Sequence, residues 1–283
     1  MSFHIVLPIG ERKMKNVEHC PFCKEVNKFS LGTQTNKDKY LSLISEELNS
    51  VPRTWYRCNN CNFVFRSPCI TKKESNILYS KYRSYEFRGE TPNEYFDRIT
   101  SYPSDKSSAY AKAKWLKWTH AKTILDVGCG GGILLYQIKK IFLGAILTGI
   151  EPNKDYANMV ENRLHINVIQ QYYRKGLINE QFDLLLCTDV IEHIHNINNF
   201  FGAIAENIKE GGYLFLSSPS TKCFDVFSIE HDVFLAPHLY FFESKHLDKL
   251  AKKHNLIMIN HSRFNFGIYE NYFVFKKITD ITI

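Results

Sequence analysis

Four cysteines near the start of the chain have the types and spacing of metal ligands. They form two CxxC pairs, Cys20 with Cys23 and Cys58 with Cys61. Zn²⁺ prefers four thiolates in a tetrahedron, and a CxxC turn presents two of them from one tight bend. Because four thiolates leave no open coordination position, we expect a structural zinc ion and not a catalytic one.

The residues around the second pair predict a β-hairpin that carries it. Trp55 to Arg57 precede the pair and Phe63 to Phe65 follow it, and both triplets are typical of strands. The stretch from Cys23 to Cys58 is longer than the about 15–20 residues of a compact ribbon, which predicts an inserted loop and short helix. A redox role for the pairs is disfavoured because no thioredoxin-like unit follows.

A glycine-rich turn stands farther along the chain. An apolar strand over 123–127 leads into Gly128-Cys129-Gly130-Gly131-Gly132, and a helix is predicted over 133–141. Glycines let the backbone approach a ligand closely, and the helix start offers free N–H groups. A dinucleotide site would need a third glycine where Ile133 stands, so another nucleotide-like ligand is favoured.

Three acidic residues lie at the ends of predicted strands. They are Asp126, Glu151 after a strand over 145–150, and Asp189 after a strand over 182–187. Because the carboxyl ends of parallel strands meet at one edge of a sheet, these carboxylates surround one cleft. A carboxylate at the position of Glu151 accepts hydrogen bonds from both hydroxyls of a ribose.

These segments together carry a family resemblance over residues 106–276. The run from Ile124 to Gly132 resembles the first motif of class I S-adenosylmethionine-dependent methyltransferases, and the runs 151–153 and 189–194 resemble two later motifs. The resemblance implies S-adenosylmethionine as cofactor. It implies that Asp126 serves the amino group, Glu151 binds the ribose and Asp189 lies beside the cofactor, above a turn of Gly128, Gly130 and Gly132.

The alternation of strands and helices, with this resemblance, predicts an α/β fold: a Rossmann-like, doubly wound sheet preceded by a small zinc-ribbon-like module. The family places its last strand, here expected over 269–275, antiparallel to the others. We expect the zinc module over 1–70, a tyrosine-rich linker or lid over 71–105 that begins with a helix, and the methyltransferase domain over 106–283.

Three histidines are candidate proton acceptors. His193 lies in the motif after the fourth strand, and His231 and His238 lie after the fifth strand, where the family inserts a substrate-binding loop. Methyl transfer needs alignment and exclusion of water, and a hydroxyl acceptor also needs its proton removed. The alternatives are a structural role for His193, and a phosphate- or hydroxyl-binding role for one of the other two.

A second ion site is a further hypothesis. Asp189, Glu192 and His193 place three ligand-type side chains on one predicted helical turn. With His231 or His238 they would bind a divalent ion, as in some RNA-end and quinone O-methyltransferases that this chain resembles. Many members of the family have these residues without a metal.

The cysteine module also bears on the acceptor. Two CxxC pairs before such a domain resemble bacterial surface-polysaccharide and deoxysugar methyltransferases. Sugar C-methyltransferases of that type carry a further C-terminal domain. The sequence stops at Ile283, soon after the expected last strand, which favours O-methylation of a sugar or a phosphorylated capsule precursor. The net charge of +7 suits an anionic small molecule.

Three alternatives are open: a sugar C-methyltransferase, an RNA methyltransferase whose ribbon reads RNA, and a non-catalytic cofactor-binding subunit. Against RNA, no Asn/Asp-Pro-Pro-Tyr/Phe run follows the fourth strand, and Arg53, Arg57 and Arg66 form no dense basic cluster. The intact motifs disfavour the non-catalytic subunit.

The sequence also bears on location. No apolar run approaches the about 20 residues that span a bilayer, and Met1 to Gly10 lack the features of a signal peptide. Metal-type cysteine pairs fit a reducing compartment. We therefore expect a cytoplasmic protein with no membrane insertion.

Overall fold

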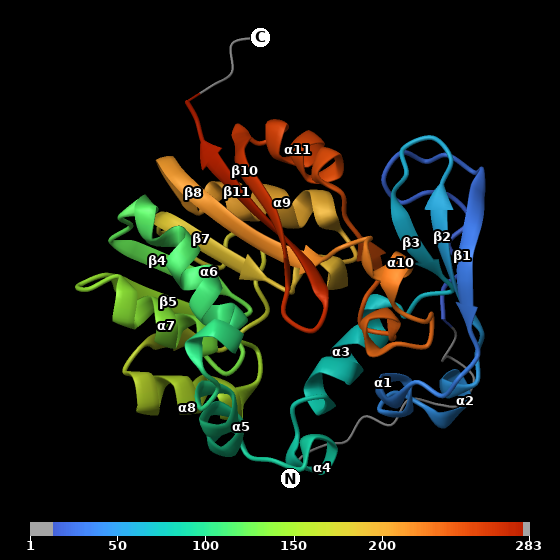
Figure 1. Ribbon diagram of the computed structural model, residues 1–283, viewed down its shortest axis with the longest axis horizontal. Coiled ribbons are helices and arrows are strands. Elements are labelled where there is room, and N and C mark those ends of the chain that lie inside the picture. Colours follow the sequence, from blue (N-terminus) through green and yellow to red (C-terminus); the bar gives the residue numbers. More distant parts are fainter. Residues whose placement is uncertain (1–13, 280–283) are drawn as a thin grey trace.

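The computed structural model describes residues 14–279, which form a large and a small β-sheet side by side (Figure 1). The beginning of the predicted zinc module, including the stretch Met1 to Gly10, and the end of the predicted catalytic domain lie outside the described residues. None of the helices within residues 14–279 is both long and apolar enough to cross a membrane.

The large sheet has seven strands in the order β10-β11-β8-β7-β4-β5-β6. Strands β4 to β8 pair in parallel, and β11 pairs antiparallel with both β8 and β10. The predicted Rossmann-like α/β fold with an antiparallel last strand is therefore confirmed. The strands are β4 (Thr123–Val127), β5 (Ile146–Ile150), β6 (Asn167–Ile169), β7 (Phe182–Thr188), β8 (Ile208–Pro219), β10 (Leu256–Asn265) and β11 (Tyr269–Lys277).

Helices cover both faces of this sheet, which explains why its central strands are apolar on both sides (Figure 1). Leu184 and Leu186 of β7 face the core beneath α6, α7 and α8, whereas Leu185 and Cys187 face the core beneath α9 and α11. This alternation follows from the two-residue period of a strand. The helices are α6 (Ser108–Leu116), α7 (Ile133–Ile141), α8 (Lys154–Leu164), α9 (Ile197–Glu206) and α11 (Ser244–Lys252).

The small antiparallel sheet joins segments from distant parts of the sequence. Its order is β1 (Lys28–Gln34), β2 (Arg53–Cys58), β3 (Val64–Ser67) and β9 (Tyr240–Phe241). The hairpin β2–β3 carries the second cysteine pair, as predicted, and the insertion before it holds the short helices α1 (Lys39–Ser42) and α2 (Glu46–Asn49). The last strand, β9, comes from the segment that follows β8.

The small sheet shares a hydrophobic core with the large one. Phe63 and Phe65 belong to the same buried cluster as Phe242, just after β9, and Leu247 in α11. Full burial of such a side chain contributes about 1.5–3 kcal/mol. The cysteine-bearing hairpin is therefore packed into the catalytic part of the chain.

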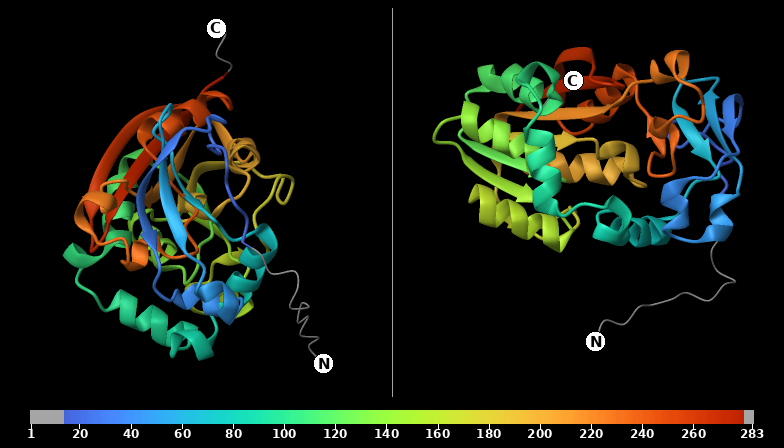
Figure 2. Two further views of the ribbon diagram at one scale, coloured as in Figure 1. Left: turned by 90° about the vertical axis from the view of Figure 1, so that its right-hand side faces the viewer. Right: turned by 60° about the horizontal axis from the view of Figure 1, so that its bottom comes forward.

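A helical strap, residues 72–100, spans the open edge between the two sheets (Figure 2). It consists of α3 (Lys72–Lys81), α4 (Tyr85–Arg88) and α5 (Pro92–Thr100), and α5 contacts α7 and α8. Thr71 with Glu74, and Thr91 with Glu94, form capping boxes that fix the starts of α3 and α5. The remaining short elements are η2 (Ser104–Lys106), η3 (Lys117–Thr119), η4 (Ile191–His193), α10 (Cys223–Val226) and η5 (Asp232–Phe234).

Candidate functional site

Two adjoining cavities lie at the carboxyl ends of β4, β5 and β7, beneath the strap. One is lined by Glu151 and His193, the other by Asp126 and the glycine turn. They share the lining residues Tyr82, Arg83, Gly128 and Asp189. The structure thus brings the three predicted carboxylates to one edge of the sheet, where ligands of such folds bind.

The glycine turn forms the floor between the cavities. Gly128 has φ +78°, and a Cβ atom there would lie 2.7 Å from Cγ2 of Val190. Gly130 has φ +55°, and its Cβ would meet Nη2 of Arg83. Gly132 has a different place, because a Cβ there would lie 2.8 Å from Cγ2 of Val160 in α8. The first two glycines keep the groove open, and Gly132 allows α7 and α8 to pack.

Glu151 is buried beside the turn and is held by two backbone amides. Its Oε2 accepts a hydrogen bond from the Gly130 amide and its Oε1 from the Asn153 amide, both at 2.9 Å. Nε of Arg83 lies 3.9 Å from Oε1. The carboxylate is therefore oriented before any ligand arrives, with lone pairs left for a diol.

Asp126 is almost fully buried at the end of β4, and its Oδ1 has no hydrogen-bond partner among the described residues. Burial raises the pKa of this carboxyl to about 7, although Lys112 opposes the rise. An unpaired buried carboxylate oxygen is costly unless a donor meets it. Its place in the lining fits the ammonium group of S-adenosylmethionine.

Lys112 is a site residue that the sequence analysis missed. Its buried ammonium lies 3.5 Å from Asp189 and 3.1 Å from Glu270, where it lines the cavity of the glycine turn. Burial opposes its charge, yet the two carboxylates raise its pKa above the ordinary value. The available signal was a lysine between Ala111 and Ala113, on the buried face of a predicted helix.

Glu192, His193 and His238 form a compact group of possible metal ligands. One ligand atom from each lies within 4.8 Å of the others. Nε2 of His193 is 3.9 Å and Nε2 of His238 is 4.0 Å from the same oxygen of Glu192. Glu192 is fully buried, and neither of its carboxylate oxygens has a hydrogen-bond partner among the described residues.

Backbone carbonyls orient both imidazoles of this group. Nδ1 of His193 donates to the Pro237 carbonyl at 2.7 Å, and Nδ1 of His238 donates to the Val233 carbonyl at 2.6 Å. A carbonyl only accepts, so both rings carry the proton on Nδ1 and turn the Nε2 lone pair toward Glu192. Burial lowers the pKa of both rings, that of His238 to about 3. Neutral imidazoles beside a carboxylate fit a divalent ion such as Mn²⁺ or Zn²⁺.

Two predicted members lie outside this group. The prediction that Asp189 shares a helical turn with Glu192 and His193 is wrong. Asp189 has φ +55°, lies before the 3₁₀ turn and is paired with Lys112. His231 begins the turn η5, accepts the Val233 amide at its Nδ1 and stacks on Phe227. Of the two histidines after the fifth strand, the structure therefore brings only His238 to Glu192.

Tyrosines of the strap face the cavity that holds His193. Tyr79 and Tyr82 line it from α3 and its end, and Tyr172 and Tyr173 line it from the segment after β6. The ring of Tyr79 meets His193 edge to face at 6.0 Å, and its buried hydroxyl has no partner among the described residues. The wall beside the histidines is thus aromatic, with an unpaired hydroxyl.

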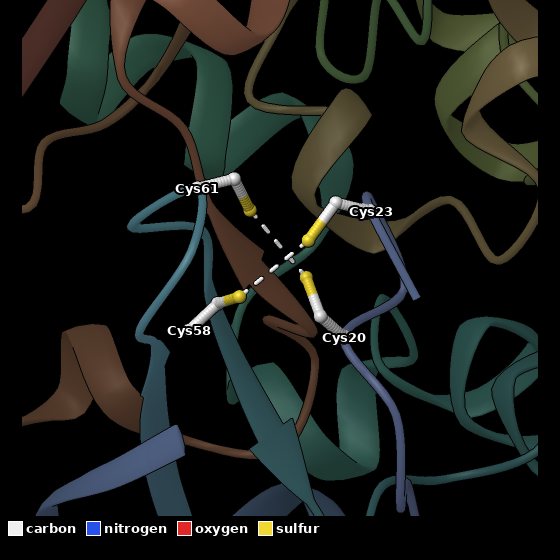
Figure 3. Close-up of side chains that lie close together, drawn as sticks. All are labelled: Cys20, Cys23, Cys58 and Cys61. Atoms are coloured by element: carbon white, nitrogen blue, oxygen red, sulfur yellow. Dashed lines mark hydrogen bonds between the residues drawn. The ribbon is translucent and has the colours of Figure 1, made fainter. Parts of the chain in front are cut away.

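The four predicted zinc ligands converge between the two knuckles (Figure 3). Sγ of Cys20 lies 3.6 Å from that of Cys61, and Sγ of Cys23 lies 3.5 Å from that of Cys58. A tetrahedron with Zn–S bonds of about 2.3 Å has edges of about 3.8 Å. Burial raises the pKa of the Cys20 and Cys61 thiols, so four thiolates need a cation at their centre. The arrangement fits a structural zinc ion.

Comparison with known proteins gives a family. A family model described as "Methyltransferase domain" matches residues 87–261. The "Ubiquinone biosynthesis O-methyltransferase" of Hydrogenovibrio crunogenus is 28% identical over 153 residues, which cover 48% of this chain and 63% of that protein. The protein of the same name from Shewanella pealeana is 35% identical over 104 residues, covering 34% and 43%. The chain thus spans less than two thirds of the length of these relatives.

Solved structures share the fold at low sequence identity. The 1,6-didemethyltoxoflavin-N1-methyltransferase of Burkholderia thailandensis has a TM-score of 0.54 at 16% identity, covering 78% of this chain and 98% of that chain. The magnesium protoporphyrin IX methyltransferase of Synechocystis, with bound S-adenosylmethionine, has 0.52 at 14%, covering 71% and 96%.

These relatives confirm the predicted class I methyltransferase domain, and their names do not support the resemblance to polysaccharide enzymes. The matched range contains the glycine turn, all three carboxylates and all three histidines, and it covers more than half of the chain. The chain belongs to this family of methyltransferase domains.

Proposed function

We propose that the protein transfers the methyl group of S-adenosylmethionine to a hydroxyl oxygen of a small molecule. One observation carries the proposal: the groove that holds the unpaired, buried carboxylate of Asp126 opens onto the imidazole of His193, which lies 3.9 Å from the fully buried carboxylate of Glu192. The first carboxylate suits the cofactor. The second suits a cation beside the acceptor.

The cofactor is placed by chemical complementarity. Asp126 would accept from its ammonium, Glu151 from its ribose hydroxyls, and Lys112 would pair with its carboxylate. Gly128 and Gly130 would let the cofactor lie close to the main chain of the turn. Asp189, at 47% side-chain exposure, lies between the cavities and would contact the cofactor where they meet.

We propose that the acceptor hydroxyl lies beside His193, which lines the cavity, with the fully buried Glu192 behind it. A divalent ion held there would lower the pKa of a bound hydroxyl. Glu192 and the Nε2 atoms of both histidines would hold the ion, and Tyr79 lines the cavity wall beside His193. Because burial lowers the pKa of His238 to about 3, we assign it as a ligand of the ion and not as the group that accepts the proton of the hydroxyl.

The chemical class of the acceptor rests on the lining. Tyrosine rings offer flat faces to an aromatic ring or to a sugar, and Arg83 offers a positive charge to an anionic group. The curated relatives are named for ubiquinone biosynthesis, and the sugar or capsule precursor predicted from the cysteine module stays a prediction. We also propose that the four cysteines hold a structural Zn²⁺.

The decisive experiment supplies labelled S-adenosylmethionine with three acceptor pools: dihydroxybenzoates, nucleotide sugars with phosphorylated sugars, and unmodified RNA. We expect label in a small-molecule pool, sharply reduced in Glu192→Gln and unchanged in Glu210→Gln, whose side chain is exposed. Label only in RNA would overturn the small-molecule acceptor. Equal label with Glu192→Gln would overturn the role of Glu192.

A further inference from the structure

We infer that Arg66 of the cysteine-bearing hairpin is a positioning residue, which holds the loop of His238 so that its imidazole faces Glu192 and His193. The inference rests on the proposed function, because it concerns the same ion-binding group. It assigns the small sheet a task beyond its own stability. Residues 233–239 form this loop, which we call the bridging loop.

Main-chain hydrogen bonds first tie the hairpin to the bridging loop. Strand β3 pairs antiparallel with β9, and the Arg66 amide donates to the Leu239 carbonyl at 3.2 Å. The Leu239 amide in turn donates to the carbonyl of Glu192 at 2.9 Å. One residue of the loop is therefore fixed between the hairpin and the backbone of a proposed ligand.

The Arg66 side chain makes a second connection. It is 1% exposed, and its Nη2 donates to the carbonyls of Leu235 and His238. Its guanidinium stacks over Trp55 at 4.7 Å. Burial lowers its pKa to about 9, although the charge of Asp38 opposes this shift. The guanidinium donates to these two carbonyls, so its charge stabilises the conformation of the bridging loop.

A third contact comes from the insertion in the cysteine-bearing region. Oδ2 of the fully buried Asp38 accepts the Ala236 amide at 2.7 Å. Residues on both sides of Pro237 are thus held by the small sheet and its insertion. The Pro237 carbonyl accepts from His193 and the Val233 carbonyl accepts from His238. The conformation of this loop therefore sets the direction of both imidazoles.

The zinc knuckle anchors the hairpin that carries Arg66. Cys61 lies just before β3, and its carbonyl accepts a hydrogen bond from Nε2 of the buried His246 in α11 at 2.9 Å. Phe63 packs against the same ring at 5.1 Å. The path runs from the cysteines through β3 to Arg66, and from there to His238.

The test compares Arg66→Met and Arg66→Lys in the zinc-loaded, full-length protein. Mn²⁺ binding is measured by electron paramagnetic resonance, S-adenosylmethionine binding by calorimetry, zinc by elemental analysis, and loop mobility by hydrogen exchange of peptides covering 233–241. The matched control is Arg57→Lys, because Arg57 lies in the same hairpin but its Nη1 faces Glu243 at 3.9 Å, outside the bridging loop.

We expect Arg66→Met to weaken Mn²⁺ binding by about tenfold or more, the usual effect of losing a residue behind a metal ligand. Exchange in 233–241 should accelerate, while zinc content and cofactor affinity stay within about twofold. Arg66→Lys should recover part of the Mn²⁺ affinity, since an ammonium still donates to a carbonyl. Arg57→Lys should leave Mn²⁺ affinity unchanged.

Two results would overturn the inference: Arg66→Met with wild-type Mn²⁺ affinity and loop exchange, or a loss of Mn²⁺ and cofactor affinity in equal proportion, which means general unfolding. If Arg66→Met does not fold, Arg66→Lys is read by the same criteria. Wild-type protein that binds no Mn²⁺ would count against the ion in the proposed function, and loop exchange would still decide whether Arg66 holds the loop.

Discussion

His193 and His238, from different segments of the chain, have ring centroids 4.9 Å apart, and both donate Nδ1–H to carbonyls of the bridging loop. Their Nε2 atoms meet one buried oxygen of Glu192. Burial and the nearby Asp189 raise the pKa of Glu192 well above its ordinary value. A cation at that point would favour the ionised carboxylate and accept the two Nε2 lone pairs, which gives the first prediction.

His238→Ala should weaken Mn²⁺ binding by at least about tenfold, because the ion loses an inner ligand. Electron paramagnetic resonance of free Mn²⁺ measures the change. His231→Ala is the informative comparison, since His231 lies outside the group, stacked on Phe227. Equal Mn²⁺ affinity in His238→Ala and wild type would remove His238 from the ligand set.

The cofactor affinity should depend on pH through Asp126. Its pKa of about 7 is well above the ordinary value of 3.8. The folded carboxyl therefore stays protonated through a window in which the unfolded one is ionised, and unfolding free energy falls as pH rises from about 4 to about 7. An ammonium ligand favours the ionised form, so binding should tighten as pH rises toward 7, by up to about tenfold per unit.

Calorimetry in buffers between about pH 5 and about pH 7 tests this dependence, because the cofactor ammonium is mostly charged in that range. Asp126→Asn, which cannot titrate, should bind the cofactor weakly with a flat profile. A wild-type profile that is equally flat would show that Asp126 does not meet the ammonium.

Glu151→Gln should weaken binding of S-adenosylhomocysteine roughly tenfold to a hundredfold. The amide retains the shape but loses hydrogen bonds of a charged acceptor, each worth about 1.5–3 kcal/mol. Calorimetry measures the affinity. Glu161→Gln serves as control because Glu161 is exposed on α8 and outside both cavities. Unchanged affinity in Glu151→Gln would contradict the ribose assignment.

Gly128→Ala and Gly144→Ala form a matched pair, because both glycines have φ +78°. A Cβ at Gly144 meets nothing within 4 Å, whereas one at Gly128 lies 2.7 Å from Val190. Each variant should lose about 1 kcal/mol or more of unfolding free energy through its backbone conformation. Only Gly128→Ala should also lose cofactor affinity, and similar losses in both variants would argue against the role of Gly128 in the groove.

Cys58→Ser should lower zinc content and the unfolding temperature together, because a fully buried ligand is replaced by a poorer one. Elemental analysis and thermal unfolding provide the two readings. Cys223→Ser changes another fully buried cysteine outside the four and should keep its zinc. Full zinc occupancy in Cys58→Ser would exclude the four-cysteine site.

Local patterns in the sequence predicted much of the cofactor site. Asp126 and the glycine turn occupy one strand–turn–helix unit, and Glu151 ends the next strand, so short-range geometry places them. The two CxxC pairs are equally local, since each knuckle is one tight turn. The paired apolar strands and intervening helices predicted the parallel sheet for the same reason.

Long-range contacts decided the rest. Lys112 owes its role to the carboxylates of Asp189, just after β7, and Glu270 in β11, and no periodicity in α6 indicates that it meets them. Asp189 lies outside the 3₁₀ turn because its backbone has φ +55°, and its side chain pairs with Lys112 of α6.

The sequence by itself determined the methyltransferase-type sheet, its cofactor-edge carboxylates and the pairing of cysteines, because these depend on neighbours within a few residues. Only the tertiary structure decided that His238 and not His231 joins Glu192 and His193. That choice requires β9 to pair with β3 from the far end of the chain, and Arg66 and Asp38 to hold the bridging loop. These contacts join residues that are far apart in the sequence, so the spacing of residue types does not predict them.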